Sequence, residues 1–367
     1  MGYYSADFRN HAISYLTANL FEEHDREKFE IFAFSFGPNV EDKMKNRIKN
    51  SVDKFYDVSF KNDHEISSLS KDLEIDIAID LMGFTEHNRF GIFLKRCAPI
   101  QVNYLGYAGT LGCKNIDYII ADKILIPEEN QKFYTEKIIY MPDTYQSNDA
   151  KKIISKKKFT KTEFGLPENS FVLCCFNKNY KITPSTFIIW MNLLKNINNS
   201  VLWLIKDNTQ SNENLKIEAS KNGINPDRIV FAERMPMEEH IARQKLANLF
   251  IDTFPYTAHT TCSDALRIGL PVVTRIGNTF ASRVAASLLN TVDLNELVTN
   301  NENEYELKII ELAKNPLKLK EINKKLNENI QTKSLYNTKL FTKNLEKAFI
   351  EIHKKFLNNL PPDNIIL

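Results

Sequence analysis

Residues 248–274 read NLFIDTFPYTAHTTCSDALRIGLPVVT, and this stretch decides the class of fold. The apolar run NLFIDT predicts a strand, the segment from Thr261 to Gly269 predicts a helix, and LPVVT predicts a second strand. A strand, a helix and a strand in succession form a unit whose two strands are parallel. Thr261 and Asp264 have the spacing of a capping box, which would account for the hydroxyl-rich helix start. The alternative is a phosphate site, because a helix N-terminus presents free N–H groups and the positive end of a dipole.

The same alternation of apolar strands and helical stretches runs through the rest of the chain. The strand-like runs are EKFEIFAFSF, EIDIAIDLMG, APIQVNYLGY, IDYIIADK and KIIYMP in the first half, and SFVLCCFN, VLWLIKD and DRIVFAE in the second. Short apolar strands separated by helices indicate parallel sheets. We therefore expect an α/β fold with two doubly wound, Rossmann-like domains and a cleft between them. Ligands of such folds bind at the carboxyl ends of the strands.

Changes in composition indicate where the domains end. Residues 151–166 are lysine-rich and lack a steady period, so we expect a linker there, between a first domain at 1–150 and a second at 167–335. Residues 336–367 read as a C-terminal helix and tail, and their many charges are typical of a solvated helix face. The sequence shows no repeat of about 34 residues, the period of tetratricopeptide repeats.

The overall composition argues against several classes of protein. The 367 residues carry a net charge of only +2, which gives no electrostatic footprint for nucleic acid. No apolar run reaches the roughly 18–20 residues of a membrane-spanning helix, and the first residues lack the pattern of a signal peptide. The five cysteines are scattered without a CxxC pair, and the seven histidines form no HxH or HxxxH cluster. We expect a reduced, cytoplasmic protein without a metal site.

Polar residues crowd the predicted strand ends of the second half. Lys181 lies between the strand SFVLCC and a helix that starts near Thr183, where an ammonium group could neutralise a phosphate; the alternative is an exposed loop lysine. His240 and Arg243 are three residues apart and share a helix face. The apolar stripe of this helix runs through Ile241, so we expect the His–Arg pair to face solvent or a ligand.

The N-terminal segment MGYYSADFRNHAISYL contains one further candidate. His11 lies where the strand-like GYYS turns into a helical pattern. An imidazole at such a position could act as a general base. The alternative is a cap or core histidine.

With these segments in order, the chain resembles the catalytic region of the O-linked N-acetylglucosamine transferase family, which includes the SPINDLY-like proteins. The resemblance rests on several stretches, which keep the family's order: SADFRNHA (5–12), APIQVNYLGYAGT (98–110), FNKNYKITPST (176–186), EEHIARQKLA (238–247), HTTCSDALRIGLPVVT (259–274) and TFASRVAASLL (279–289). They cover essentially the whole chain, without the tetratricopeptide repeats of the relatives. The resemblance implies a GT-B architecture.

The resemblance also implies roles for particular residues. His259, Thr260 and Thr261 would meet the diphosphate of a nucleotide sugar, Asp264 the ribose, and His240 and Arg243 the base. Lys181 would offset the charge of the leaving nucleotide, and His11 would line the acceptor side as a candidate catalytic base. The remaining matched positions are Lys178 and Tyr180 in the nucleotide-sugar site, and Leu105, Gly106 and Tyr256 in the acceptor and sugar pocket.

The activity implied is an inverting, metal-independent transfer of a sugar, N-acetylglucosamine from UDP-GlcNAc, to serine or threonine hydroxyls of a protein acceptor. The expected partners are a nucleotide sugar and a protein acceptor, with no nucleic acid, no membrane span and no cofactor. Lys178 replaces the amide, and Tyr256 the small residue, that relatives commonly have at these positions. These departures leave a fucosyl- or other hexosyltransferase of the same fold as one alternative. The other, suggested by the missing repeats and the short first strand, is a catalytically idle nucleotide-sugar-binding or scaffold protein.

Overall fold

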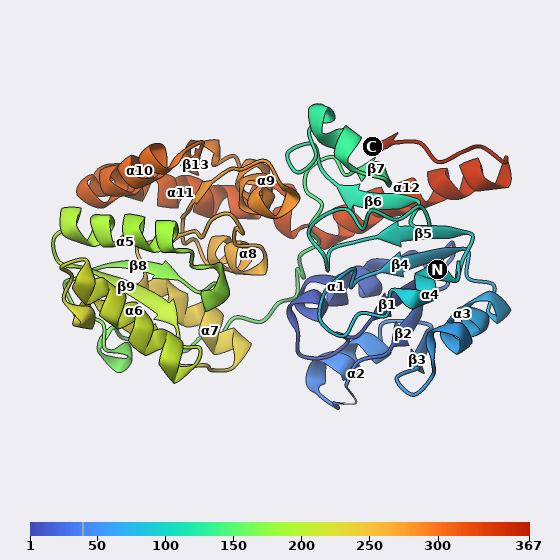
Figure 1. Cartoon of the computed structure of the whole chain (residues 1–367), viewed down its shortest axis with the longest axis horizontal. Helices are drawn as coiled ribbons and strands as arrows, with labels where there is room; N and C mark the ends of the chain where they lie inside the picture. Colours follow the sequence, from blue (N-terminus) through green and yellow to red (C-terminus); the bar gives the residue numbers. More distant parts are fainter. Residues whose placement is uncertain (39) are drawn as a thin grey trace. The chain divides into compact units, whose positions relative to one another are not determined.

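The chain divides into two compact units, one of which is discontinuous in sequence. The computed structural model describes residues 1–38 and 40–367. The first unit comprises Met1–Lys151 together with Ser334–Leu367, and the second comprises Lys152–Lys333. Each unit contains one parallel sheet covered by helices (Figure 1). The predicted pair of parallel-sheet α/β domains is confirmed.

The first unit is built on an eight-stranded sheet in the order β14-β7-β6-β5-β4-β1-β2-β3. Its strands are β1 (Gly2–Ser5), β2 (Phe32–Ser35), β3 (Lys54–Asp57), β4 (Ile77–Asp80), β5 (Ile100–Asn103), β6 (Tyr118–Ala121), β7 (Lys137–Tyr140) and β14 (Ile365–Ile366). Its helices are α1 (Ala12–Glu23), α2 (Lys43–Lys49), α3 (Asp63–Asp72), α4 (Gly91–Leu94) and α12 (Thr338–Leu357). The strand β1 pairs in parallel with both β2 and β4, so it is central in the sheet.

The second unit has a six-stranded sheet in the order β10-β9-β8-β11-β12-β13. Its strands are β8 (Phe171–Cys175), β9 (Ser200–Ile205), β10 (Ile229–Ala232), β11 (Leu249–Ile251), β12 (Val272–Arg275) and β13 (Val298–Thr299). Its helices are α5 (Pro184–Asn196), α6 (Thr209–Lys221), α7 (Met237–Arg243), α8 (Thr260–Arg267), α9 (Val284–Thr291), α10 (Glu302–Lys314) and α11 (Pro316–Thr332). Figure 1 shows α5 and α10 on one side of this sheet and α6 on the other.

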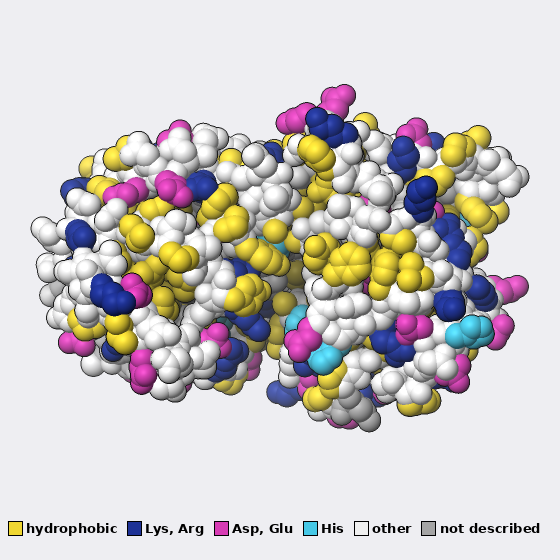
Figure 2. Space-filling model, viewed as in Figure 1, with side chains coloured by type: hydrophobic (Ala, Val, Ile, Leu, Met, Phe, Trp, Pro, Cys, Tyr) yellow, Lys and Arg dark blue, Asp and Glu magenta, His cyan; other side chains and the backbone are white. Residues whose placement is uncertain are grey.

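Burial on both faces explains the continuous apolar runs of the sequence. Tyr3 and Tyr4 of β1 are fully buried, and so are Phe250 and Ile251 of β11. A parallel strand covered by helices on both faces exposes no side chain and therefore has no reason to alternate polar with apolar residues. Charged side chains of both signs are interspersed over the visible face in Figure 2. In the described residues, no helix is long and apolar enough to cross a membrane.

The structure differs from the predicted boundaries at the linker and at the C-terminus. Part of the segment 151–166 packs on the second unit, where the Ser155 N–H donates to the Glu238 carbonyl (3.0 Å). Helix α12 belongs to the first unit, where Glu346 accepts a hydrogen bond from the buried His24 (Nδ1–Oε1 2.9 Å). Figure 1 shows α12 among the elements of the first unit. The predicted solvated helix face is therefore only one side of α12, because its other side buries Leu345 and Phe349.

Candidate functional site

The order of the strands in the second unit reverses between β8 and β11. These strands are neighbours, and the chain leaves them in opposite directions: β8 leads through α5 to β9, and β11 leads through α8 to β12. In an open parallel sheet, ligands bind beyond the carboxyl ends of two strands whose connections diverge in this way. The segment after β8 contains Lys181, and the segment after β11 contains His259, so the topology brings these two predicted site residues to the same edge.

Asp252, the residue after β11, fixes the loop that leads to α8. Its buried Oδ1 accepts hydrogen bonds from the N–H groups of Thr253 (2.8 Å) and Ala258 (2.7 Å). Its Oδ2 accepts one from the Thr274 hydroxyl (2.7 Å). Burial raises the pKa of Asp252 to about 6, an effect that these hydrogen bonds oppose. Because both ends of the segment 253–258 are bonded to one carboxylate, the loop has a defined shape.

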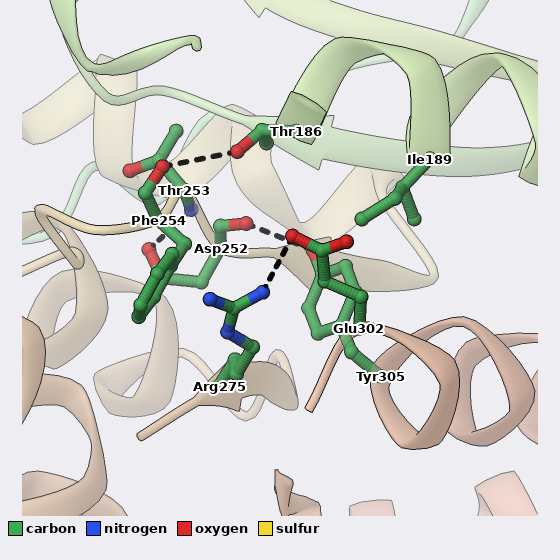
Figure 3. Close-up of a pocket in the computed structure, with 8 residues that line it drawn as sticks. All are labelled: Thr186, Ile189, Asp252, Thr253, Phe254, Arg275, Glu302 and Tyr305. Atoms are coloured by element: carbon green, nitrogen blue, oxygen red, sulfur yellow. Dashed lines mark hydrogen bonds and ion pairs between the residues drawn. The ribbon is translucent and has the colours of Figure 1, made fainter. Parts of the chain in front are cut away.

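A small pocket lies behind this loop and has a structural role. Figure 3 shows Arg275 paired with Glu302 (Nη1–Oε1 2.7 Å) beside Asp252 and Tyr305. The Tyr305 hydroxyl donates to the backbone carbonyl of Asp252 (2.8 Å), and the Thr186 hydroxyl donates to that of Phe254 (3.1 Å). The pocket has room for about one water molecule. These contacts hold the backbone of the loop at Asp252 and Phe254.

Lys181 is held against the loop from β11. Its Nζ donates to the Thr257 carbonyl (3.0 Å) and lies 3.7 Å from the ring centroid of Tyr256. Burial lowers the pKa of Lys181 to about 8, and the nearby Asp252 opposes this shift. The alternative of an exposed loop lysine is therefore wrong. The ammonium group is still mostly protonated at pH 7.

The start of α8 carries hydrogen-bonding groups that the helix itself does not use. The helix begins at Thr260 with His259 as its N-cap, and the N–H groups of Thr260 and Thr261 donate no hydrogen bond within residues 1–38 and 40–367. The Thr261 hydroxyl donates to Asn177 Oδ1, and Asp264 pairs with Lys152. The predicted capping box is therefore wrong, because both of its side chains have partners outside the helix.

His259 is neutral. Burial lowers its pKa to about 3, and the positive charge of Lys181 lowers it further. Its Nε2 lies 3.3 Å from the Ala281 carbonyl, so this nitrogen carries the proton. The imidazole also packs against the Tyr256 ring, with centroids 4.9 Å apart. The Ala281 carbonyl and the tilted Tyr256 ring thus hold His259, and the Thr257 carbonyl holds Lys181, before any ligand arrives.

Arg243 differs from its prediction. The pair with His240 was expected to face solvent or a ligand, but the Arg243 side chain is only 1% exposed. Its Nη1 donates to the Glu233 carbonyl (2.7 Å) and its Nη2 to His240 Nδ1 (2.7 Å). Its guanidinium carbon lies 5.6–5.8 Å from three aromatic ring centroids, those of Phe164, Phe176 and Trp203. The Arg243 side chain is buried because its cation–π contacts with these rings compensate for the lost hydration of the guanidinium group.

The contact with Arg243 determines the state of His240. A guanidinium has no acceptor, so His240 Nδ1 must accept the hydrogen bond and Nε2 carries the proton. Burial, followed by the charge of Arg243, lowers the pKa of His240 to about 3. The ring lies against Phe176, the residue after β8, with centroids 5.1 Å apart. Of the predicted base-binding pair, only His240 is therefore partly accessible to solvent. Arg243 is buried and holds the His240 ring through the hydrogen bond to Nδ1.

Lys178 and Tyr180 are the exposed members of the predicted site. The Tyr180 side chain is 71% exposed and its ring centroid lies 6.5 Å from that of Tyr256. Lys178 is exposed one turn earlier, in the same loop as Lys181. Tyr180 therefore lies beside the loop from β11.

The sequence prediction missed Asn177, Asp252 and Lys152. Asn177 and Asp252 each lie just beyond the end of a strand, and that position is a signal that could have identified them. The amide of Asn177 donates to Asp252 Oδ1 (3.1 Å) and to the Thr253 hydroxyl (2.7 Å), so it joins the two strand ends. Lys152 is 112 residues away from its partner Asp264, and the local sequence gives no signal for it.

The candidates of the first unit lie at turns after β1 and β5. His11 is the N-cap of α1, with Nδ1 3.4 Å from the Ile13 N–H nitrogen and 3.3 Å from Asp7 Oδ2. Its side chain is 40% exposed, so the cap role leaves part of the ring open to solvent. Leu105 has a φ of +69° and is buried. A Cβ on Gly106 would lie 2.0 Å from the Leu81 carbonyl oxygen, so this turn packs tightly on the end of β4.

The comparisons with known proteins agree with this architecture. The family described as glycosyl transferase family 41 matches residues 1–159 and 153–345. A probable UDP-N-acetylglucosamine–peptide N-acetylglucosaminyltransferase SEC from Arabidopsis thaliana is 35% identical over 358 residues, which is 96% of this chain and 37% of the relative. A UDP-N-acetylglucosamine–peptide N-acetylglucosaminyltransferase from Caenorhabditis elegans is 26% identical over 100% of this chain and 41% of its own length. The chain thus spans about two-fifths of the length of these curated relatives.

A solved structure shows the same fold. A mutant O-GlcNAc transferase from Thermobaculum terrenum has a TM-score of 0.89 and 27% identity, over 98% of this chain and 68% of that one. A glycosyltransferase from Rickettsia africae shares the fold alone, with a TM-score of 0.62 and 10% identity.

Proposed function

Because the chain belongs to glycosyl transferase family 41, we propose that it transfers N-acetylglucosamine from UDP-GlcNAc to serine or threonine hydroxyls of a protein acceptor. We propose further that the reaction inverts the anomeric centre and requires no metal ion. Its fold is that of the O-GlcNAc transferase catalytic region, with the two parallel-sheet α/β domains of the GT-B architecture. The proposal extends to this chain what the names of its relatives state of them.

The observation that carries the proposal is the arrangement of charge at the end of β8 and β11. The Lys181 ammonium group and the N–H groups of Thr260 and Thr261, which have no partner among the described residues, belong to the two segments that meet there. Departure of a nucleoside diphosphate leaves negative charge on its phosphates. A fixed ammonium and the positive end of a helix stabilise that charge in place of a metal ion. In the described residues, no three His, Cys, Asp or Glu side chains are grouped to hold a metal.

The other residues of the second unit would bind the nucleoside. In the proposed site, His240 packs on the base and offers its Nε2–H, and Asp264 accepts a hydrogen bond from the ribose. His259 adds a neutral ring beside the diphosphate, and because it carries no charge it leaves Lys181 as the cation of this group. In the first unit, His11 would face the acceptor, with Asp7 near its Nδ1. The acceptor proton can pass to His11 or to the leaving diphosphate.

Calorimetry with UDP and GDP, in the presence and absence of EDTA, tests the proposal. We expect UDP to bind the full chain, GDP to bind more weakly, and EDTA to leave both affinities unchanged. Loss of UDP binding in EDTA would contradict the metal-free site. Tighter binding of GDP would favour the fucosyltransferase alternative.

Mass spectrometry of a host proteome after co-expression tests the transfer itself. We expect N-acetylhexosamine on serine or threonine, and we expect it to disappear with the Lys181→Met variant. A chain that binds UDP and yields no modified residue would support the idle nucleotide-sugar-binding alternative.

A further inference from the structure

A buried ion pair joins the start of the second unit to helix α8. Lys152 Nζ bonds Asp264 Oδ1, and the two side chains are only 7% and 8% exposed. Burying two charges is costly unless they pair closely and their remaining polar atoms are used. No described residue donates a hydrogen bond to the other carboxylate oxygen, Oδ2, within residues 1–38 and 40–367. Asp264 is therefore fixed at one oxygen and has acceptor capacity at the other.

Lys152 also lies near the other half of the proposed nucleoside site. Its charge contributes to the lowered pKa of His240, after burial and Arg243. Three residues later, the Ser155 N–H donates to the Glu238 carbonyl in α7 (3.0 Å), so this segment contacts α7. Lys152 thus contacts α8 through Asp264 and lies close to α7 near His240. These are the two helices that supply the proposed ribose and base contacts.

We propose that Lys152 is a positioning residue of the donor site, which holds Asp264 Oδ1 so that Oδ2 accepts a hydrogen bond from a ribose hydroxyl. The inference rests on the proposed function, because it assumes that a nucleotide binds at α8. A carboxylate without its cationic partner would be left buried and uncompensated, so it would turn toward solvent or take up a proton. In either case the ribose loses a charged acceptor of fixed direction.

The test compares UDP with 2′,3′-dideoxy-UDP, which lacks both ribose hydroxyls, in calorimetry on the full chain. A hydrogen bond to a charged group is worth about 1.5–3 kcal/mol, so the wild-type protein should bind UDP roughly 10- to 100-fold more tightly than the dideoxy analogue. We expect both Lys152→Met and Asp264→Asn to reduce this ratio to within about threefold. Lys152→Arg should restore much of the ratio, because it keeps the charge.

A matched control is available at the neighbouring position. Lys151 is exposed and pairs with Glu22 at 2.7 Å, so Lys151→Met should leave the ratio unchanged. If Lys152→Met fails to fold, Lys152→Gln provides the same comparison, because it is neutral and still able to donate to Oδ1. An intermediate ratio in Lys152→Gln then supports the inference, and a full ratio overturns it.

The outcomes separate this inference from the proposed function. Wild-type protein that binds no UDP contradicts the proposed function itself. A second outcome is that the wild-type protein binds UDP and discriminates against the dideoxy analogue, and that the Lys152→Met variant discriminates equally well. This outcome overturns only the role of Lys152. Reduced affinity for both ligands at an unchanged ratio would show a purely structural ion pair and would also overturn it.

Discussion

Lys181 holds a positive charge in a place where that charge is costly. Its folded pKa of about 8 lies below the usual value for lysine, because burial disfavours the ammonium form. This lowered pKa reduces the free energy of unfolding. The reduction is fully present below about pH 8 and disappears as the pH rises toward the pKa of about 10.4 that lysine has in the unfolded chain. The Tyr256 ring and the Thr257 carbonyl only partly replace the lost water. Such a group is typical of a binding site, where a ligand supplies the missing compensation.

Replacing Lys181 with methionine should therefore separate activity from stability. We expect turnover to fall about 10²–10³-fold, the usual cost of losing one charge-stabilising donor. We expect the melting temperature at pH 7 not to fall, because the substitution removes a desolvated charge and keeps the aliphatic packing. Transfer assays and thermal unfolding check the two effects, and a variant with near-normal turnover would contradict the assigned role.

The affinity for UDP should depend on pH through the same ammonium group. A bound diphosphate favours the charged form, so the pKa of Lys181 is higher in the complex than in the free protein. Affinity should then be constant just below about pH 8 and fall by up to tenfold per pH unit above it. Calorimetry from about pH 7 to about pH 9.5 measures this slope. Lys181→Arg, which stays protonated throughout this range, should show a flat profile.

At the scale of elements, two tight turns constrain the backbone, one between α8 and β12 and one after β5. Gly269 ends α8 with a φ of +79°, and the N–H of Leu270 bonds back to the Ala265 carbonyl (3.0 Å), so the predicted helix stop is confirmed. The turn after β5 combines the left-handed Leu105 with Gly106, which contacts the end of β4. A bulky residue at positive φ is strained, and packing must maintain it.

Gly106→Ala should destabilise the first unit. The new Cβ would lie 2.0 Å from the Leu81 carbonyl oxygen, so β4 or β5 must shift. Such overpacking typically costs about 1–3 kcal/mol. Hydrogen exchange should show the lost protection in β4 and β5. Gly112→Ala is the matched control: Gly112 has a φ of +60° and nothing within 4 Å of its added Cβ, so only backbone strain, about 1 kcal/mol, is expected.

At the scale of the whole molecule, the C-terminal segment completes the unit that contains the N-terminus. Helix α12 packs on α1, and β14 pairs in parallel with β7 at the edge of the first sheet. His24 at the end of α1 is buried and bonded to both Tyr3 (2.8 Å) and Glu346 (2.9 Å). The first unit therefore cannot be complete until residue 334 and beyond have been added.

Phe349→Ala should reveal this dependence. Phe349 is fully buried in α12, and truncating a buried phenylalanine costs about 3–5 kcal/mol. Hydrogen exchange should show reduced protection in β1 and α1, which are more than 300 positions away in sequence, and little change in β8 and β11. Phe356→Ala, at a residue 45% exposed, serves as the control. Equal losses in both units would contradict the division of the chain.

The sequence by itself determined the class of fold and the strand ends that carry the candidate site. Runs such as SFVLCC and NLFIDT identify buried parallel strands, because a strand covered on both faces is apolar throughout. Lys181, His259 and Thr260 could be found in the same way, since a strand, a turn and a helix start are consecutive in the chain. The resemblance to the O-GlcNAc transferase family could likewise be recognised from contiguous stretches of sequence, and it is confirmed.

Only the tertiary structure decided which side chains meet over long distances. It turned Arg243 inward, because three aromatic rings from separate segments surround it. In the folded chain Asp264 forms an ion pair with Lys152, where the sequence predicted a capping box. Helix α12 packs in the first unit, although it follows the second unit in sequence. Local sequence predicts what each segment prefers, whereas these contacts depend on where buried apolar surface and opposite charge become available after the chain has folded back on itself.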